Sequence, residues 1–265
     1  MSTWILLRGL ARETRHWGGF AEVFADAFPE GRVLFLDLPG NGVFNGQRSP
    51  SSIAALAEHC RDTAARLGAA PPYHLLALSM GAMVAVAWAE RHPEEIAGCV
   101  LISTSFGSFS PLCHRLRPRA WPALLGILVA PGAHAREQRV LKLTSGRPEA
   151  HERVLEAWTV IRRSHPVSAS NGLRQLLAAA RFRAPQAAPA PTLVLAGAGD
   201  RLVDPRCSLA IARRWHCPLA LHPEAGHDLP LDDGAWVARE VLGWCAGLRS
   251  GIMVAEGERA SRALS

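Results

Sequence analysis

The sequence predicts an α/β fold in which a doubly wound, mostly parallel sheet carries helices on both faces. Short and almost wholly apolar runs, typical of strands buried on both sides, alternate with stretches of helical spacing. Turn-forming residues separate many of these runs. The chain has 265 residues, of which 49% are hydrophobic and 20% charged, as in globular proteins with a sizeable core. This length fits one large domain, or one domain with an insertion.

Strands and helices are predicted in alternation along most of the chain. The predicted strands are 4–7, 32–36, 73–78, 98–103, 192–196 and 218–221. The predicted helices are 17–28, 51–67, 81–91, 209–215 and 234–248. Between about 104 and 190 there is no strand pattern, and prolines interrupt short helical stretches. We therefore expect a core from 1–105 and 188–248, a helical cap over 106–187, and a flexible tail over 249–265.

Composition excludes several classes of protein. No apolar run reaches the roughly 20 residues that a membrane span needs. The apolar run near the N-terminus is too short for a secretory signal. The six cysteines are scattered without a Cys-x-x-Cys pair, which favours free thiols, mostly buried, and argues against a zinc site. We expect a cytoplasmic protein.

The positive charge is concentrated in the predicted cap. The net charge is +6, and residues 107–187 hold 13 basic and 4 acidic residues. This uneven distribution, without a nucleic-acid-binding motif, argues against a nucleic-acid-binding protein. It fits either a solvated arginine-rich surface or a site for an anionic substrate or acidic protein partner.

A candidate nucleophile lies where the third predicted strand meets the following helix. The segment Ala77-Leu78-Ser79-Met80-Gly81 has the strand–turn–helix context of a nucleophile elbow, with small residues two before and two after the serine. The turn would raise the Ser79 hydroxyl above the sheet edge. The alternative is an ordinary serine that caps the helix.

A serine nucleophile needs a base and an acid that orients it. His227 follows the sixth predicted strand in a glycine-containing loop, at the strand edge where open α/β sheets bind ligands. Asp200 directly follows the fifth strand and is favoured as the acid, with Asp204 as the alternative. The oxyanion hole would use the amides of Met80 and Leu10, where Gly9 lets the backbone come close.

These segments together resemble the α/β-hydrolase superfamily, specifically small esterases similar to the pimeloyl-carrier methyl ester esterases. The resemblance covers about residues 4–248, is weakest in the cap, and rests on these segments: Leu7-Arg8-Gly9, Asp37-Leu38-Pro39-Gly40-Asn41-Gly42, Leu78-Ser79-Met80-Gly81, His92-Pro93-Glu94, Gly197-Ala198-Gly199-Asp200 and Gly226-His227. The order Ser79, Asp200, His227 matches this class. The resemblance implies a Ser–His–Asp triad, a helical lid, no cofactor and no metal.

The chain departs from the family pattern in two ways. Arg8 stands where the family usually has histidine, and a cation there would either favour an anionic substrate or form a salt bridge. The first predicted strand is already the one before the oxyanion loop, so we expect a sheet without the family's two leading strands.

The resulting hypothesis is hydrolysis of a carboxylic ester or thioester through an acyl-enzyme. Acyl transfer by the same triad, and a binding or signalling protein with little turnover, are the alternatives. Cap side chains expected to line an acyl pocket, or else to pack in the core, are Trp121, Leu124, Leu125 and Trp158. Cap arginines expected to dock an acidic acyl-carrier protein are Arg136, Arg139, Arg162 and Arg163.

Overall fold

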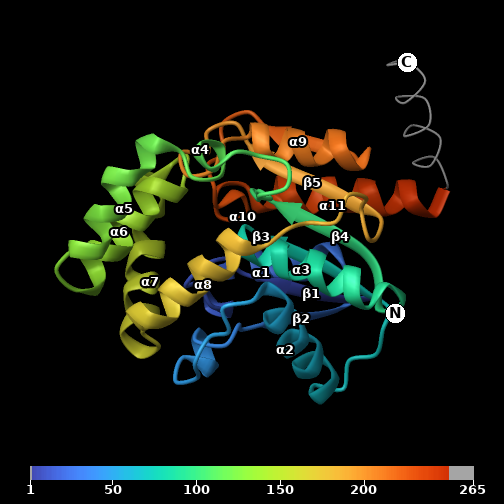
Figure 1. Ribbon diagram of the computed structural model, residues 1–265, viewed down its shortest axis with the longest axis horizontal. Helices are drawn as coiled ribbons and strands as arrows, with labels where there is room; N and C mark the ends of the chain where they lie inside the picture. Colours follow the sequence, from blue (N-terminus) through green and yellow to red (C-terminus); the bar gives the residue numbers. More distant parts are fainter. Residues whose placement is uncertain (1, 251–265) are drawn as a thin grey trace.

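The computed structural model describes residues 2–250 and contains one parallel sheet (Figure 1). The spatial order of its strands is β2-β1-β3-β4-β5-β6. The strands are β1 (Thr3–Leu7), β2 (Arg32–Leu36), β3 (Tyr73–Leu78), β4 (Ile96–Ile102), β5 (Thr192–Gly197) and β6 (Leu219–His222). The chain places β2 on one side of β1 and then adds β3 to β6 in turn on the other side, as in a doubly wound sheet. The predicted fold class is therefore confirmed.

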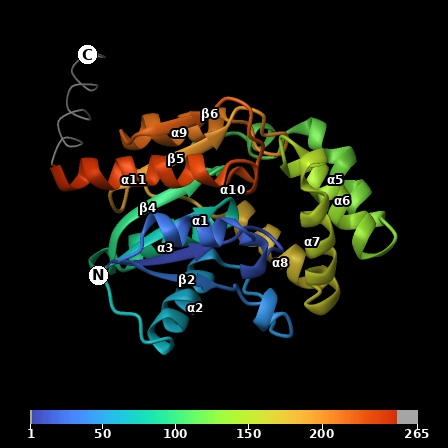
Figure 2. The same cartoon turned by 180° about the vertical axis from the view of Figure 1, so that it is seen from behind.

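Helices cover both faces of the sheet because strand side chains alternate between the faces. On one face, Ile5, Leu75 and Leu101 pack in a core with α2 (Ile53–Arg66), α3 (Met80–Arg91) and α9 (Arg206–Trp215). On the other face, Trp4, Leu76 and Val100 pack with α1 (Phe20–Ala27) and α11 (Gly234–Ser250), which lie in front of the sheet in Figure 2. The four inner strands, β1, β3, β4 and β5, are thus buried on both sides.

The segment 106–187, which we call the cap segment, runs between β4 and β5 and is helical. Its helices are α4 (Leu112–Arg115), α5 (Trp121–Val129), α6 (Gly132–Thr144), α7 (Glu152–Ser164) and α8 (Ala169–Arg181). Prolines lie at helix starts or between helices, where the missing N–H costs little. In both views α5, α6 and α7 project from one end of the sheet, and α8 leads back to it (Figures 1 and 2).

Shorter elements complete the described chain. A four-residue helix, α10 (Leu229–Asp232), precedes α11. Single 3-10 turns are η1 (Thr14–Trp17), η2 (Gly42–Phe44), η3 (Pro93–Glu95), η4 (Pro118–Ala120) and η5 (Pro148–His151). Because α11 extends to Ser250, residues 249–250 of the predicted tail are helical, and residues 251–265 lie outside the described residues. Within residues 2–250, no helix is both long and apolar enough to span a bilayer.

Candidate active site

Ser79 lies in the sharp turn between β3 and α3. Its backbone has φ 57° and ψ −117°, a conformation that residues with a Cβ rarely adopt. The Ser79 amide donates a hydrogen bond of 2.8 Å to the Ile102 carbonyl. The Thr104 hydroxyl donates one of 2.8 Å to the Ser79 carbonyl. The end of β4 and the residues after it therefore hold this turn in its strained conformation.

The loop after β1 passes directly beside Ser79. A Cβ built on Gly9 would lie 3.1 Å from the Ser79 Cβ and 3.6 Å from its Oγ. Leu10, one of the two predicted oxyanion donors, follows this glycine. Met80, the other, is the first residue of α3, and amides in the first turn of a helix have no acceptor within the helix. Both predicted donors thus belong to segments that contact or adjoin Ser79.

His227 and Asp200 are brought together from the loops after β6 and β5. The Nδ1 of His227 lies 2.8 Å from Oδ2 of Asp200, and both side chains are buried. The other carboxylate oxygen of Asp200 accepts hydrogen bonds from the amides of Leu202 (2.8 Å) and Val203 (2.9 Å). The carboxylate is therefore fixed by backbone donors on one side and faces the imidazole on the other.

The His227 imidazole has a raised pKa. Burial alone would lower this pKa, but the charge of Asp200 and its hydrogen bond raise it above the ordinary value of 6.5, with a smaller contribution from Asp228. Because the Asp200 carboxylate can only accept, the hydrogen bond assigns the proton to Nδ1 and leaves Nε2 unprotonated in the neutral ring. This is the protonation state that a general base needs.

Asp204, the alternative acid, has a different partner. Its Oδ2 lies 2.7 Å from Nη2 of Arg206. Hydrogen bonding from Arg206 lowers the pKa of Asp204 to about 2, although burial opposes the shift. Asp200, and not Asp204, is the carboxylate that meets the His227 ring.

Arg8 forms a buried salt bridge. Its Nη1 and Nη2 donate to the two carboxylate oxygens of Asp228 at 3.0 and 2.5 Å. Asp228 is the residue after His227. The salt-bridge alternative for Arg8 thus describes the structure, and the cation is neutralised within the protein instead of facing an anionic substrate.

A second group of buried charges joins the cap segment to the core. Arg12 donates to Glu137 of α6 at 2.7 Å, and its guanidinium carbon lies 4.2 Å from the Trp158 ring centroid. Glu137, which is fully buried, also accepts from Arg162 of α7. The carboxylate of Glu137 therefore binds one arginine from the core and one from the cap.

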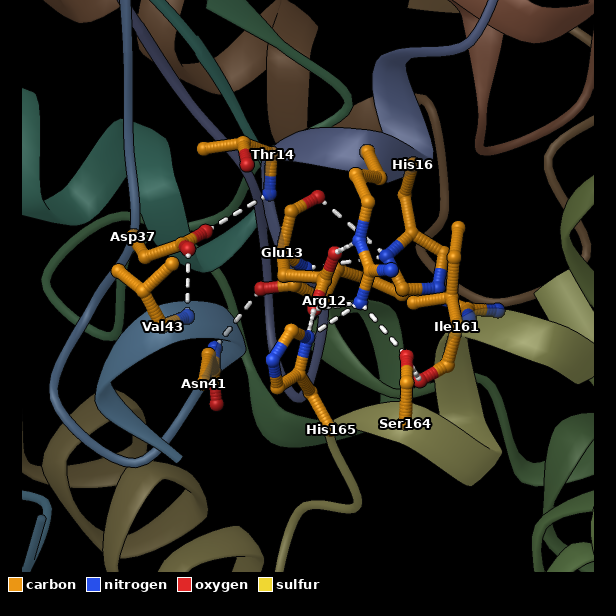
Figure 3. Close-up of polar contacts among 11 residues, drawn as sticks. Arg12, Glu13, Thr14, His16, Asp37, Asn41, Val43, Ile161, Ser164 and His165 are labelled. Carbon is orange, nitrogen blue, oxygen red and sulfur yellow. Dashed lines mark hydrogen bonds and ion pairs between the residues drawn. The ribbon is translucent and has the colours of Figure 1, made fainter. Parts of the chain in front are cut away.

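Figure 3 shows the neighbouring contacts between the loops after β1 and β2 and the end of α7. Asp37 accepts from the amides of Thr14 (2.7 Å) and Val43 (3.0 Å). His165, just after α7, has Nδ1 at 3.2 Å from a carboxylate oxygen of Glu13. These contacts fix two of the loops at the carboxyl edge of the sheet and attach the cap to one of them.

The four side chains predicted for an acyl pocket have different surroundings. Trp158 is buried and packs with Leu141 and Ile161. Trp121 and Leu125 are 50% and 60% exposed, and Leu124 is half-buried. Because it also contacts Arg12 and His16, Trp158 packs between the cap helices and the loop after β1, and acyl contact by these four residues stays a prediction.

The four arginines predicted for partner docking do not form one free surface. Arg162 is engaged by Glu137. Arg136 is half-buried, and its Nε donates to the Ala130 carbonyl at 3.2 Å. Arg139 and Arg163 are exposed. A partner that approaches the cap would therefore meet Arg139 and Arg163 rather than Arg162.

Some residues that shape the site were missed by sequence reasoning. Thr104, Asp228 and Glu137 each bind a partner at least 25 residues away, so no local pattern marks them. His92, Glu94 and Glu95 lie close enough together to share a metal ion. They lie just before β4, at the amino ends of the strands, whereas Ser79 lies at the carboxyl ends. Glu95 already accepts hydrogen bonds from Arg61 and Trp88. These three residues are therefore not part of the Ser79 site.

Comparisons with known proteins identify the family of the chain. The family model described as serine aminopeptidase, S33, matches residues 5–234. A pimeloyl-[acyl-carrier protein] methyl ester esterase from Chromobacterium violaceum is 27% identical over 230 residues, which cover 85% of this chain and 78% of that protein.

Solved structures share the fold. An esterase from Thermogutta terrifontis has a TM-score of 0.72 and 24% identity, covering 93% of this chain and 90% of that one. An esterase from a Rhodococcus species has a TM-score of 0.73 and 21% identity, covering 93% and 91%. At this identity the structures show the α/β-hydrolase fold alone.

Proposed function

Because the chain belongs to the serine aminopeptidase, S33, family of hydrolases, we propose that it is a serine esterase that cleaves carboxylic esters or thioesters with Ser79, His227 and Asp200. The observation that supports this most is the buried 2.8 Å contact between His227 and Asp200, at the same sheet edge as the strained turn of Ser79. A buried imidazole oriented by a carboxylate, at the sheet edge that bears the serine, is what acyl transfer by a serine requires.

The proposed reaction has two halves. His227 Nε2 takes the Ser79 hydroxyl proton while Oγ bonds to the acyl carbon, and the amides of Met80 and Leu10 stabilise the oxyanion. The bond to the leaving group then breaks, and the imidazolium returns the proton to the departing alcohol or thiol. In the second half, His227 deprotonates a water molecule that attacks the acyl carbon. The bond from that carbon to Ser79 Oγ then breaks, the imidazolium returns the proton to Oγ, and the carboxylic acid leaves.

A labelling experiment tests the nucleophile. A fluorophosphonate probe should label the wild type but not Ser79→Ala. The control is Ser208→Ala, which removes a different buried serine, on α9, and should be labelled like the wild type. Ser79→Ala should also lose turnover of p-nitrophenyl esters, and the optimum among esters of graded chain length would size the acyl pocket. A folded wild type that is not labelled would contradict the proposal and favour a binding or signalling protein.

Esters fit the charges near the site better than peptides do. An aminopeptidase must bind the ammonium group of a peptide N-terminus, for which a nearby carboxylate is needed. The three acids in the loops that bear His227 and Asp200 are already paired: Asp200 with His227, Asp228 with Arg8 and Asp204 with Arg206. Turnover of aminoacyl p-nitroanilides faster than of matched esters would reverse this preference.

For the acyl donor, we propose a chain bound to an acidic carrier protein. The support is the similarity to an esterase whose name specifies an acyl-carrier substrate, together with exposed cap arginines such as Arg139 and Arg163. Raising the salt concentration should then lower kcat/KM for carrier-bound esters and leave p-nitrophenyl esters unchanged. Equal salt responses would remove the carrier from the proposal. Product analysis with added alcohols would distinguish hydrolysis from acyl transfer.

A further inference from the structure

A large cavity lies between the cap segment and the loop after β5. Its volume is about 610 Å³, which is the size of pockets that hold small organic molecules. One wall comes from η4, α5 and α6, and the other from residues 198–201 after β5. Helices α5 and α6 lie side by side in Figures 1 and 2. Neither Ser79 nor His227 lines it.

The cavity wall is strongly basic. Its cationic side chains are Arg117, Arg119, Arg139, Lys142 and Arg201. Within residues 2–250, none of these five forms a salt bridge with an acidic side chain. Asp200 is the acid in the wall, and its carboxylate is already bound by His227 and two amides. The positive charge of the wall is therefore not neutralised by the wall itself.

Three of the cations are held in place by neutral acceptors. Arg117 Nη1 donates to the Asp200 carbonyl at 2.7 Å. Arg139 donates to the Gly126 carbonyl, and Arg201 to the Lys142 carbonyl at 3.4 Å. Backbone carbonyls orient a guanidinium without cancelling its charge, so these groups keep donors and charge for a ligand. A cavity whose charges are already oriented loses less entropy when it binds an anion.

We propose that this cavity binds the phosphate group of a small organic ligand. Several guanidinium groups together match a doubly charged phosphate, whose oxygens accept paired hydrogen bonds from the guanidinium fork. The volume exceeds what a phosphate ion needs, and the apolar residues Pro122, Ala123 and Leu143 of the wall would contact the organic part. The site does not depend on the proposed esterase reaction.

Binding of phenyl phosphate, measured by isothermal titration calorimetry, tests the site. The test variant combines Arg119→Gln and Lys142→Gln, because both side chains are exposed and line the cavity. The control combines Arg153→Gln and Arg213→Gln, which remove one exposed charge each from α7 and α9, outside the cavity. Losing two charged donors should raise Kd at least about tenfold in the test variant, and the control should bind like the wild type.

Two results would overturn the proposal: no binding of phenyl phosphate by the wild type, or equal binding by the wild type and the folded test variant. Benzyl alcohol, which lacks the phosphate, should bind neither to the wild type nor to the test variant. The calorimetric measurement reports binding alone, so it gives the same result whether or not the protein is an active esterase. A failure of the phosphate site is therefore distinguishable from a failure of the proposed esterase function.

Kinetics then distinguishes two sources of the phosphate. If the substrate's leaving group carries it, a coenzyme A thioester should have a higher kcat/KM than the same acyl thioester of N-acetylcysteamine, and the test variant should lose this difference. If a separate ligand carries it, the two thioesters should be alike, while phenyl phosphate still binds. The first result would identify the occupant of the cavity as the leaving group of the substrate, and the second would identify it as a separate phosphorylated ligand.

Discussion

Arg8 and Asp228 form a buried ion pair that joins the loop after β1 to the loop after β6. Two hydrogen bonds, of 3.0 and 2.5 Å, connect the guanidinium to both carboxylate oxygens, and neither side chain is more than 4% exposed. Arg8 precedes the glycine that contacts Ser79, and Asp228 follows His227. The pair therefore joins the loop beside Ser79 to the loop that bears His227.

Removing one member of this pair should be costly. In Arg8→Met the Asp228 carboxylate would stay buried without its counterion, so the free energy of unfolding should fall by about 3–5 kcal/mol. The double variant Arg8→Met, Asp228→Leu should recover most of that loss, because no buried charge is left unpaired. Urea denaturation measures both. A double variant as unstable as the single one would show that the pair contributes more than mutual neutralisation.

The same pair makes stability depend on pH in the acid range. Burial would raise the pKa of Asp228, but the charge and hydrogen bonds of Arg8 lower it below the ordinary value of 3.8. A carboxylate whose pKa is lower in the folded state stabilises the fold above its unfolded pKa, and this contribution disappears as the pH falls through its folded pKa. The wild type should therefore lose stability below about pH 4 more steeply than the double variant. Parallel slopes of unfolding free energy against pH would contradict this.

The raised pKa of His227 predicts the acid limb of the pH–rate profile. The base must be unprotonated, so kcat/KM for a p-nitrophenyl ester should rise with pH through a midpoint above 6.5. In Asp200→Asn the carboxylate that raises this pKa is gone and burial still lowers it, so the midpoint should move to lower pH. Turnover should also fall by about 10⁴.

Asp204→Asn is the matched control, because Asp204 pairs with Arg206 and not with the imidazole. It should keep both the midpoint and most of the turnover. A shift of the acid limb in Asp204→Asn, with none in Asp200→Asn, would exchange the roles of the two acids.

Local patterns were sufficient to predict the sheet and the positions of Ser79, Asp200 and His227. Each of these residues directly follows a strand or lies in the loop after one, and parallel strands bring their carboxyl ends to one edge. Arg8 and Asp228 are 220 positions apart, and their pairing depends on how the strands are ordered in the sheet. The sequence therefore left open whether Arg8 would face a substrate or a carboxylate.

The cap was harder to predict because α5 is apolar on every side. Its sequence, Trp121-Pro122-Ala123-Leu124-Leu125-Gly126-Ile127-Leu128-Val129, has no polar face to mark the side that meets solvent. Trp121 and Leu125 are exposed, whereas the cavity wall uses Pro122, Ala123 and Gly126 of the same helix. Only the packing of α5 against α6 decides which residues point inward.

Two glycines beside Ser79 should respond differently to alanine. A Cβ on Gly81 would lie 2.5 Å from the Leu7 carbonyl oxygen and 2.6 Å from that of Arg8. These are backbone atoms of β1 and its loop, so they cannot move aside independently. A Cβ on Gly9 meets the Ser79 Cβ at 3.1 Å and the Leu78 carbonyl at 3.3 Å, contacts that a small shift relieves.

Gly81→Ala should therefore destabilise the fold by about 1–3 kcal/mol or more through overpacking. In Gly9→Ala most of the stability should remain, but a displaced Ser79 or oxyanion loop should lower kcat by up to about 10²-fold. Gly172→Ala in α8 is the control, since its Cβ would meet nothing within 4 Å and alanine favours helix by about 1 kcal/mol. Thermal unfolding and ester turnover separate the three outcomes. A Gly81→Ala variant stabilised like Gly172→Ala would mean that α3 is not pressed against the loop after β1, and the proposed oxyanion hole would lose its geometric basis.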